Sequence, residues 1–284
     1  MDRRDPAQIY GVLGNPAKHS LSPLMHNAAF QALKINAHYV IFEKKSEELE
    51  YFFSSLSRQR IFGLNVTLPY KEKVIAFLDT ISKEAKLIGA VNTIKRTPRM
   101  LLGLNTDGEG FLRHLNEDLQ FEPKDKVIAL LGAGGAAKAI SVYLGKQGPK
   151  KICAYDIDAT KLSALEACLK KNFKGINFVQ ADTIEGLCIN ECDLLINATP
   201  VGMKESDPCI IDGKFMHRGL LVYDLIYNPP ETKLLALAKK LGAKTANGLG
   251  MLLYQGALSF EYFTGRGAPI EIMRRALNEG VKRL

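Results

Sequence analysis

The sequence predicts an α/β protein of two domains, a mixed α/β domain and a doubly wound domain built on a parallel sheet. Three observations lead to this fold class. The chain has 284 residues, of which 46% are hydrophobic, which is enough for two ordinary cores. Short apolar runs alternate with amphipathic helical segments between residues 127 and 241. A glycine-rich turn at 132–135 joins one of those runs to a helix.

The first part of the chain mixes strands and helices without a strict alternation. An apolar strand is expected at 9–14, and Asn15-Pro16 ends it. The next helix is expected to begin with Ser22 as its N-cap and Pro23 as its first helical residue. The remaining elements expected here are strands at 38–42, 63–67, 91–94 and 101–105 and helices at 47–57, 71–78 and 82–88.

The second part alternates strand and helix regularly after a linking helix at 110–119. The run at 127–131 is continuously apolar, as in a strand that is buried on both faces. The alternation predicts a parallel, doubly wound sheet. The other elements expected here are strands at 151–155, 177–180, 193–198 and 220–224 and helices at 135–147, 159–171 and 232–241.

Two final helices, at 252–263 and 270–281, are expected to pack back on the first domain. We therefore place the mixed domain at 1–107 and 246–284, and the doubly wound domain at 108–245. The sequence shows no internal repeat and no low-complexity segment.

Bulk properties exclude several classes of protein. No apolar stretch approaches the ~20 residues that cross a bilayer, and the first residues lack the apolar run of a secretory signal, so we expect a cytoplasmic protein without a membrane partner. The five cysteines form no CxxC pair. Cys188 and Cys192 have no histidine nearby to complete a zinc site, so we expect reduced thiols and no metal.

The formal net charge of +8 favours acidic or anionic partners. The lysines are spread along the chain, and no dense basic run is interleaved with aromatic residues, so we expect no nucleic-acid partner. Attraction of small anions is the favoured functional interpretation. A solvated surface with extra lysines remains the alternative for most of the excess charge.

The turn after 127–131 has the pattern G-x-G-x-x-A of a dinucleotide-binding, Rossmann-type domain. Gly132 permits the tight turn, Gly134 lets the backbone approach a pyrophosphate, and Ala137 allows the helix to pack closely on the strand. The helix N-terminus adds free N–H groups and the positive end of the helix dipole. The motif predicts that the pyrophosphate is held by Gly132, Ala133, Gly134, Gly135 and Ala136.

An acidic residue at the end of the next strand predicts which dinucleotide is bound. Asp156 stands a little over ~20 residues beyond the glycines, where a carboxylate commonly accepts hydrogen bonds from the adenosine ribose. Such a carboxylate repels a 2′-phosphate, which favours NAD over NADP. The alternative is a surface carboxylate that caps the helix beginning at Ala159, a role that Asp158 fits better.

Polar residues concentrate at strand ends in the first domain. Ser20 and Ser22 lie beside a helix start, a place suited to a carboxylate ligand. Two further clusters follow, at 65–71 and at 89–93 with 105–108. Polar groups gathered in this way mark a binding site more often than a core.

Carried by these residues, the chain resembles the shikimate dehydrogenase family, including its quinate/shikimate dehydrogenase relatives. The resemblance covers nearly the whole chain and implies the same two-domain fold, with the active site in the cleft between the domains. The motifs that carry it are, in order, GNPAKHSLSP, NVTLPYK, GAVNT, NTDG, GAGGAA, NATPVGM, DLIY and GLGMLLYQ.

The resemblance also implies roles for individual residues. Lys71 and Asp107 resemble the catalytic pair, with Lys71 moving the proton of the reacting hydroxyl and Asp107 orienting it. The residues implied to bind substrate are Ser20, Ser22, Thr67, Lys71, Asn92, Asp107, Tyr227 and Gln255. The residues implied to line the nicotinamide side are Ala198, Thr199, Leu225 and Gly248.

The chain departs from the family's commonest pattern at the end of the second strand of the cofactor domain. NADP-using members carry an Asn-Arg-Thr type stretch there, whose arginine clamps the 2′-phosphate, whereas this chain has Asp156-Ile157-Asp158. That difference is typical of the NAD-preferring quinate/shikimate branch. Ser22, by contrast, is retained where some quinate-preferring relatives carry threonine. We therefore expect shikimate as the main substrate, quinate as a second one, and NAD as the preferred cofactor with NADP also usable.

The implied function is the reversible, NAD(P)-dependent reduction of 3-dehydroshikimate to shikimate in the biosynthesis of chorismate and aromatic amino acids, by a monomer or homodimer. Three alternatives stay open: a catabolic quinate/shikimate dehydrogenase, a non-catalytic ligand sensor that kept the fold, and a folate-linked dehydrogenase. The presence of both Lys71 and Asp107 disfavours the sensor, and the Ser20 and Ser22 site disfavours the folate-linked enzyme.

Overall fold

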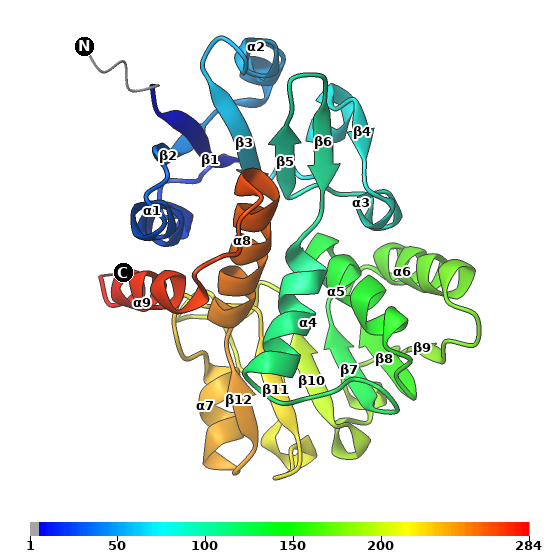
Figure 1. Ribbon diagram of the computed structural model, residues 1–284. Coiled ribbons are helices and arrows are strands. Elements are labelled where there is room, and N and C mark those ends of the chain that lie inside the picture. The colour runs from blue at the N-terminus through cyan, green and yellow to red at the C-terminus, as the bar shows by residue number, and fades with distance from the viewer. Residues whose placement is uncertain (1–5, 284) are drawn as a thin grey trace. The chain divides into compact units, whose positions relative to one another are not determined.

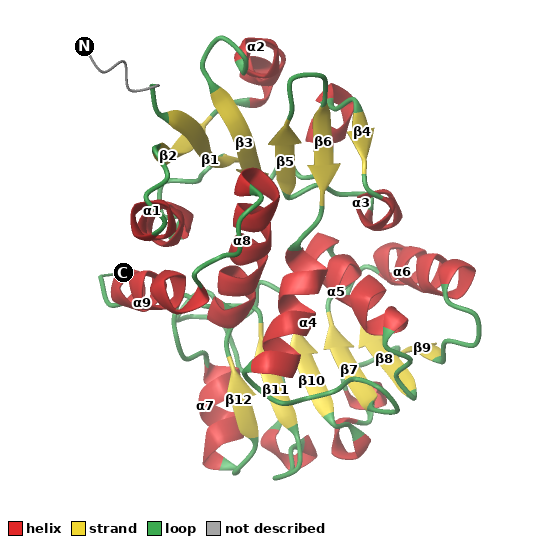
Figure 2. Ribbon diagram, viewed as in Figure 1, coloured by secondary structure: helices red, strands yellow, loops and turns green. Residues whose placement is uncertain are grey.

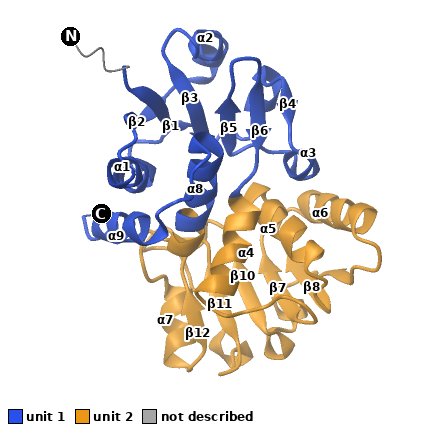
Figure 3. Ribbon diagram, in the orientation of Figure 1, with its two compact units in different colours: residues 1–106, 253–284 blue, residues 107–252 orange. Residues whose placement is uncertain are grey.

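The computed structural model describes residues 6–283, which divide into two compact units (Figure 3). The described residues up to Thr106 and from Leu253 onward form unit 1, and Asp107–Leu252 form unit 2. The boundaries expected from the sequence lay after residues 107 and 245. The assignment of the units to substrate and to dinucleotide stays a prediction.

Unit 1 is built on a six-stranded mixed sheet with the order β2-β1-β3-β5-β6-β4 (Figure 2). Strand β1 pairs in parallel with β2 and β3, while β5 runs antiparallel to β3 and β6. The antiparallel pairs make the sheet mixed, as the sequence predicts. The strands are β1 (Gln8–Gly14), β2 (Ala37–Glu43), β3 (Ile61–Val66), β4 (Thr80–Ile81), β5 (Thr93–Arg96) and β6 (Leu101–Leu104).

Helices cover both faces of this sheet, and the alternation along β3 shows how. Leu64 and Val66 belong to an apolar cluster with Phe52 and Phe53 of helix α2. Gly63 and Asn65 face the opposite way, toward helix α8, as the period of two in a strand requires. Helices α1 and α9 pack against each other (Figure 1). The helices are α1 (Ser22–Ala32), α2 (Leu49–Ser55), α3 (Lys83–Ile88), α8 (Leu249–Thr264, in this unit from Leu253) and α9 (Ile270–Val281).

Unit 2 is built on an all-parallel sheet with the order β12-β11-β10-β7-β8-β9. This is the doubly wound order, in which the strand order reverses between β7 and β10; in sheets of this kind, ligands bind at the carboxyl ends of those two strands. The strands are β7 (Val127–Leu131), β8 (Lys151–Tyr155), β9 (Phe178–Gln180), β10 (Leu194–Asn197), β11 (Leu221–Asp224) and β12 (Lys244–Ala246).

The central strands of unit 2 are buried on both faces. Helix α7 covers the face that carries Ala129, Leu131 and Val222. Helices α4 and α5 pack together on the opposite face, where the ring of Phe111 meets that of Tyr223 at 4.7 Å between centroids. The helices of this unit are α4 (Asp107–Glu117), α5 (Gly135–Lys146), α6 (Ala159–Asn172) and α7 (Lys233–Lys240).

Two local predictions near the expected site are wrong. Ser22 is the first residue of α1 and not its N-cap, because Leu21 already has helical backbone angles and the Ser20 hydroxyl accepts the Ser22 N–H at 3.3 Å. Helix α4 begins at Asp107 and not at residue 110. Gly108 therefore lies inside the helix. A Cβ at this position would overlap the Ala139 carbonyl on α5, so glycine permits the two helices to pack closely.

Short elements account for the other differences. The sequence analysis missed β4 and β12, which have two and three residues and leave no period to detect. The helix expected at 71–78 is a single 3₁₀ segment, Lys73–Phe77. The five cysteines are free thiols, as expected. Within residues 6–283, no helix is long and apolar enough to span a membrane, and no cluster of three or more His, Cys, Asp or Glu side chains is placed to hold a metal ion.

Candidate active site

The glycine-rich turn of unit 2 is shaped to admit a ligand against its backbone. Gly132 has φ +98°, a conformation that other residues adopt only with strain, and its Cβ would lie 3.1 Å from the Ala198 carbonyl. A Cβ at Gly134 or Gly135 would meet no protein atom within 4 Å. The turn therefore leaves open space over the start of α5.

The N-terminus of α5 lacks a side-chain cap among the described residues. Its first N–H groups therefore stay available to an anion, and the helix dipole favours negative charge there. Together with the open space at Gly134 and Gly135, this arrangement fits a dinucleotide pyrophosphate. The residues that would hold it are those expected from the motif.

The Asp156 carboxylate is fixed beside this turn. One oxygen accepts the Ala133 N–H at 2.6 Å, and the other accepts the Asp158 N–H at 2.8 Å. Both contacts orient the carboxylate and still leave lone pairs on each oxygen for hydroxyl donors. The arrangement is suited to a ribose, and the role itself stays a prediction.

Asp158 has the capping role expected from the sequence. It is the N-cap of α6 and accepts the N–H groups of Thr160 and Lys161 at 3.0 and 3.3 Å. Hydrogen bonds from the Thr160 side chain and then from Lys161 lower the pKa of Asp158 to about 2. Ile157, between the two acids, is 93% exposed. The stretch Asp156-Ile157-Asp158 therefore presents an isoleucine and no arginine to a 2′-phosphate.

A buried pair, Asn197 and Asp224, shapes the loops that follow β10 and β11. The Asn197 amide donates to the Asp224 carboxylate at 3.0 Å and accepts the Thr199 hydroxyl at 2.7 Å. Asp224 also accepts the Thr232 hydroxyl at 2.7 Å, and burial raises the pKa of this carboxyl. Sequence reasoning did not assign either residue, although both open motifs that it quoted.

The residues expected on the nicotinamide side lie in the segments that follow β10, β11 and β12. Ala198 and Thr199 follow β10, at the strand edge where Gly132 follows β7. A Cβ on Gly248 would overlap the Leu225 carbonyl, so glycine is required for the two segments to meet. Tyr227 is partly buried, which raises the pKa of its phenol.

In unit 1, the two serines expected to bind a carboxylate lie at the start of α1. Ser20 accepts the Ser22 N–H, and Ser22 is only 6% exposed. The Ser22 side chain hydrogen-bonds Tyr39, whose phenol also donates to Asn65 at 2.8 Å. Burial raises the pKa of Tyr39 well above its ordinary value, and the bond with Ser22 opposes this rise.

A network of buried hydrogen bonds then extends from Asn65 to Asn92, one of the expected substrate residues. Asn65 donates to the Ser259 hydroxyl of α8 at 2.8 Å, and Ser259 lies 2.8 Å from the Thr93 hydroxyl. Asn92 donates to the Thr106 hydroxyl at 2.9 Å. The Asn92 side chain is therefore held in one orientation.

The last of the expected substrate residues in this network comes from α8. Gln255 accepts a hydrogen bond from the Asn92 amide at 3.3 Å, and it is 9% exposed. One turn further along the helix, the hydroxyl of the fully buried Ser259 donates to the backbone carbonyl of Gln255 at 2.9 Å. The sequence analysis did not identify Ser259, although a lone serine in an apolar helix was a signal for it.

Lys71 and Thr67 lie in the segment that follows β3. The Thr67 N–H donates to the Leu13 carbonyl at 2.9 Å, and the Lys71 carbonyl accepts the Val91 N–H at 2.7 Å. Lys71 is partly exposed in unit 1, and Asp107, at 7% exposed, is the first residue of unit 2. The pairing of these two side chains stays a prediction.

Two family models match the chain. The shikimate dehydrogenase substrate binding domain matches residues 12–94, and the shikimate 5′-dehydrogenase C-terminal domain matches residues 248–277. The shikimate dehydrogenase (NADP(+)) of Methanopyrus kandleri is 43% identical and aligns over 96% of each chain.

Solved structures agree with these matches. A shikimate dehydrogenase in complex with NADP+ has a TM-score of 0.90 at 39% identity, covering 97% of this chain and 96% of that one. A shikimate 5-dehydrogenase of Listeria monocytogenes, in complex with shikimate and NAD, has a TM-score of 0.87 at 32% identity, covering 95% and 96%.

Proposed function

The chain belongs to the shikimate dehydrogenase family of NAD(P)-dependent oxidoreductases, and from this premise we propose that it catalyses the reversible reduction of 3-dehydroshikimate to shikimate in aromatic amino acid biosynthesis. The observation that carries the proposal is the near-full-length match to such enzymes in a chain that keeps Lys71, Asp107 and both serines. The orientation of Asn92 and Gln255 by buried hydrogen bonds supports a site built for a polyhydroxylated acid.

The proposed chemistry needs one proton and one hydride to leave the alcohol. Lys71, in its neutral form, takes the hydroxyl proton onto Nζ as the carbon–oxygen double bond forms. Asp107 orients the hydroxyl and stabilises the resulting ammonium. The nicotinamide ring, when bound, supplies the hydride acceptor. In the reducing direction, the Lys71 ammonium returns the proton to the carbonyl oxygen.

Ser20 and Ser22 would hold the ring carboxylate by hydroxyl donors at the start of α1. Asn92 and Gln255 would face the ring hydroxyls, and the hydrogen bonds of Asn92 to Gln255 and to Thr106 hold the two side chains together. Thr67 and Tyr227 complete the proposed set. Positioning of this kind converts binding energy into orientation at the reacting carbon.

We further propose that NAD is the preferred cofactor, although the M. kandleri relative carries NADP(+) in its name. Asp156 supports the preference, because its carboxylate is fixed at the glycine turn and would repel a 2′-phosphate. Lys161, the first basic residue after Asp156 in the sequence, forms an ion pair with Asp158 at 3.2 Å. The L. monocytogenes enzyme with bound NAD is a precedent within the family.

The test is the initial rate of cofactor reduction with shikimate or quinate against NAD or NADP. We expect fast turnover of shikimate with NAD, slower turnover of quinate, and little turnover with NADP. A clear NADP preference would keep the enzyme and overturn the role of Asp156. The absence of reduction in all four combinations would favour the ligand sensor.

A paired variant sharpens this test. Asp156→Asn with Ile157→Arg removes the repulsion and adds a guanidinium, so the ratio of kcat/KM for NADP over NAD should rise by at least tenfold. Glu191→Gln is the matched control and should leave the ratio unchanged. Glu191 is an exposed acid just before β10, at the amino ends of the strands and away from the glycine turn.

A further inference from the structure

The segments that follow β10 and β11 in unit 2 are joined by one pair of polar side chains. Asn197 is the last residue of β10, and Asp224 is the last residue of β11. The two strands are neighbours, with Asn197 opposite Asp224 in the parallel register. Both residues are fully buried, so neither side chain can contact a ligand. Any effect of the pair on binding must therefore act through the residues that it holds.

The Asn197 side chain uses its full hydrogen-bonding capacity. Its amide nitrogen donates to the Asp224 carboxylate at 3.0 Å and to the Val201 carbonyl at 3.2 Å. Its amide oxygen accepts the Thr199 N–H at 3.1 Å and the Thr199 hydroxyl at 2.7 Å. Because a side-chain amide has two donors and two acceptor lone pairs, all four are occupied. These bonds fix the orientation of the amide and the course of the chain over 198–201.

Three donors converge on the Asp224 carboxylate. One oxygen accepts the Asn197 amide and the Ile226 N–H, at 3.0 and 3.1 Å, and the other accepts the Thr232 hydroxyl at 2.7 Å. Burial raises the pKa of this carboxyl, and the three hydrogen bonds oppose the rise. An ionised carboxylate has only acceptors, so it suits a place where each of these partners is a donor. Asp224 thereby joins the segment 225–232 to Asn197.

Backbone contacts add the segment that follows β12. The Leu225 N–H donates to the Asn197 carbonyl at 2.9 Å, and the Gly248 N–H donates to the Ile226 carbonyl at 3.1 Å. A Cβ on Gly248 would overlap the Leu225 carbonyl, so the two segments are in direct contact. The residues expected to line the nicotinamide side are therefore held together around the buried pair; they are Ala198, Thr199, Leu225 and Gly248.

We propose that Asn197 and Asp224 are positioning residues for the nicotinamide half of the cofactor, and that they act through Thr199 and Leu225. This inference rests on the proposed function, which assigns the nicotinamide to these segments. Within residues 6–283, the side chains of the pair make no hydrogen bond to the glycine turn at 132–135. The pair should therefore control binding of the nicotinamide half and leave binding of the adenosine and pyrophosphate half unchanged.

The test is titration of the full-length protein with NADH, followed by nicotinamide fluorescence, and with ADP-ribose, which lacks the nicotinamide, followed by calorimetry. Asn197→Asp keeps the shape of the side chain but sets an acceptor oxygen against the Asp224 carboxylate and the Val201 carbonyl. The Kd of NADH should rise about tenfold, and that of ADP-ribose should stay within about twofold. NADPH and 2′-phospho-ADP-ribose are titrated in parallel, so that the contrast does not depend on Asp156.

A milder pair of variants tests the other end of the network and keeps the proposal falsifiable if Asn197→Asp does not fold. Thr232→Val removes the hydroxyl that donates to Asp224 and caps α7, and it should weaken NADH about threefold. Thr232→Ser keeps the hydroxyl and should bind NADH as the wild type does. Circular dichroism and urea denaturation check that each variant is folded.

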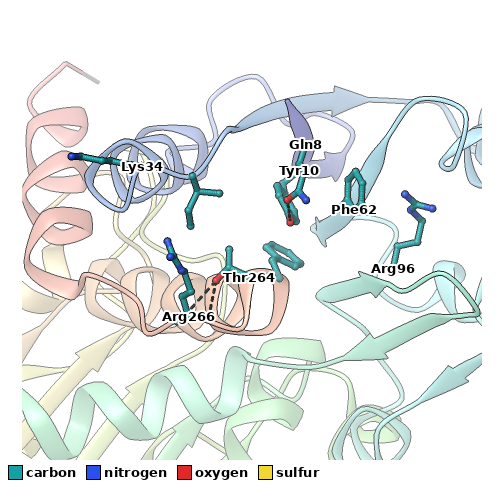
Figure 4. A pocket seen from close by; sticks show the side chains of 9 residues that line it. Gln8, Tyr10, Lys34, Phe62, Arg96, Thr264 and Arg266 are labelled. Atoms are coloured by element: carbon teal, nitrogen blue, oxygen red, sulfur yellow. Dashed lines mark hydrogen bonds between the residues drawn. The ribbon is translucent and has the colours of Figure 1, made fainter. Parts of the chain in front are cut away.

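One control is chosen in each unit. In unit 2, Asp193→Asn changes an aspartate just before β10, at the opposite end of the strand from Asn197, that accepts the Val127 N–H at 2.8 Å. In unit 1, Tyr10→Phe removes a hydroxyl that donates to Gln8 at 2.9 Å. Both of these residues line a cavity of about 400 Å³ that the proposed function does not use (Figure 4). Neither control should change the affinity for NADH or for ADP-ribose.

The contrast between the two ligands decides the outcome. Equal weakening of NADH and ADP-ribose by Asn197→Asp would overturn the proposal, because the pair would then only stabilise unit 2. Unchanged NADH affinity, equal affinity in Thr232→Val and Thr232→Ser, or a matching loss in Asp193→Asn would do so too. Binding is measured without turnover, so a wild-type protein that binds NADH but does not oxidise shikimate would contradict the proposed reaction alone. A wild-type protein that binds neither reduced cofactor would overturn both.

Discussion

The residues proposed to bind ligands are held by different means in the two units. In unit 2, the half proposed to hold the cofactor is mostly backbone: the turn at Gly132, the uncapped N–H groups of α5 and the close approach at Gly248. In unit 1, the half proposed to hold the substrate is mostly side chains, held by buried hydrogen bonds that centre on Ser259. A backbone site depends on residues without a Cβ, whereas a side-chain site depends on every partner in its network.

The largest expected effect tests the reacting group on the side-chain half. Lys71→Met should lower kcat for shikimate about 10³-fold, since acid–base groups contribute about 10²–10⁴-fold, and should leave cofactor affinity within twofold. Steady-state rates and fluorescence titration of the reduced cofactor measure the two quantities. Lys73→Met, at an exposed neighbouring position, is the control. Near-normal turnover of Lys71→Met would remove Lys71 from the mechanism.

The second prediction breaks the network at its centre. Ser259→Ala removes one buried hydrogen bond from Asn65 and one from Thr93, which keep their bonds to each other and to Asn92, so it should cost about 1 kcal/mol of unfolding free energy. The KM for shikimate should rise by about twofold, because the Thr93 and Thr106 hydroxyls that bond Asn92 each lose their contact with Ser259, while the KM for the cofactor stays unchanged.

Ser141→Ala is the matched control for this change. Ser141 in unit 2 is equally buried, but its hydroxyl has no hydrogen-bond partner within the described residues. Its loss should be neutral or stabilising in chemical denaturation. Equal destabilisation by the two alanines would show that the Ser259 bonds add nothing.

A third prediction concerns acid sensitivity in unit 1. His26 is fully buried, stacks on Tyr39 at 4.2 Å between ring centroids, and burial lowers its pKa to about 3. The unfolded chain takes up a proton near pH 6.5, and the folded chain does so only near pH 3. His26 therefore costs stability as pH falls through this window, by up to about 1.4 kcal/mol per pH unit.

His26→Phe should remove that part of the pH dependence and retain the packing against Tyr39, Phe30 and Phe260. Urea denaturation at intervals between pH 7 and pH 4 measures the slope. His38→Phe, at an exposed position on β2, is the control. An unchanged slope in His26→Phe would mean that other groups set the acid limit.

The smallest expected effects contrast two glycines of the backbone half. Gly132→Ala should cost about 1–2 kcal/mol of stability, because φ +98° strains an alanine. Gly135→Ala should gain up to about 1 kcal/mol, because alanine favours the helix and its Cβ meets nothing within 4 Å.

Both glycine variants should bind the cofactor less tightly, since a methyl group would occupy the proposed phosphate space. Thermal unfolding without ligand and titration with NAD separate stability from binding. Unchanged NAD affinity in Gly135→Ala would place the pyrophosphate elsewhere.

Local signals explain what could be predicted near the site. The strand at 127–131 and its glycine turn are encoded by a few adjacent residues, and the structure has them where expected. The capping role of Asp158 is local in the same way. The predicted N-cap of α1 and the predicted start of α4 were wrong. The Ser20 hydroxyl accepts the Ser22 N–H, so Ser22 is not the cap, and Gly108 serves the close contact of α4 with α5 and does not end the helix.

The sequence by itself determined the fold class, through the alternation of apolar runs and helical segments, and it determined the glycine turn and the family motifs, through spacing over a few residues. Only the tertiary structure decided how Ser259 joins Asn65 across 194 positions of the chain. Contacts between distant segments arise from packing in three dimensions, and no local pattern records them.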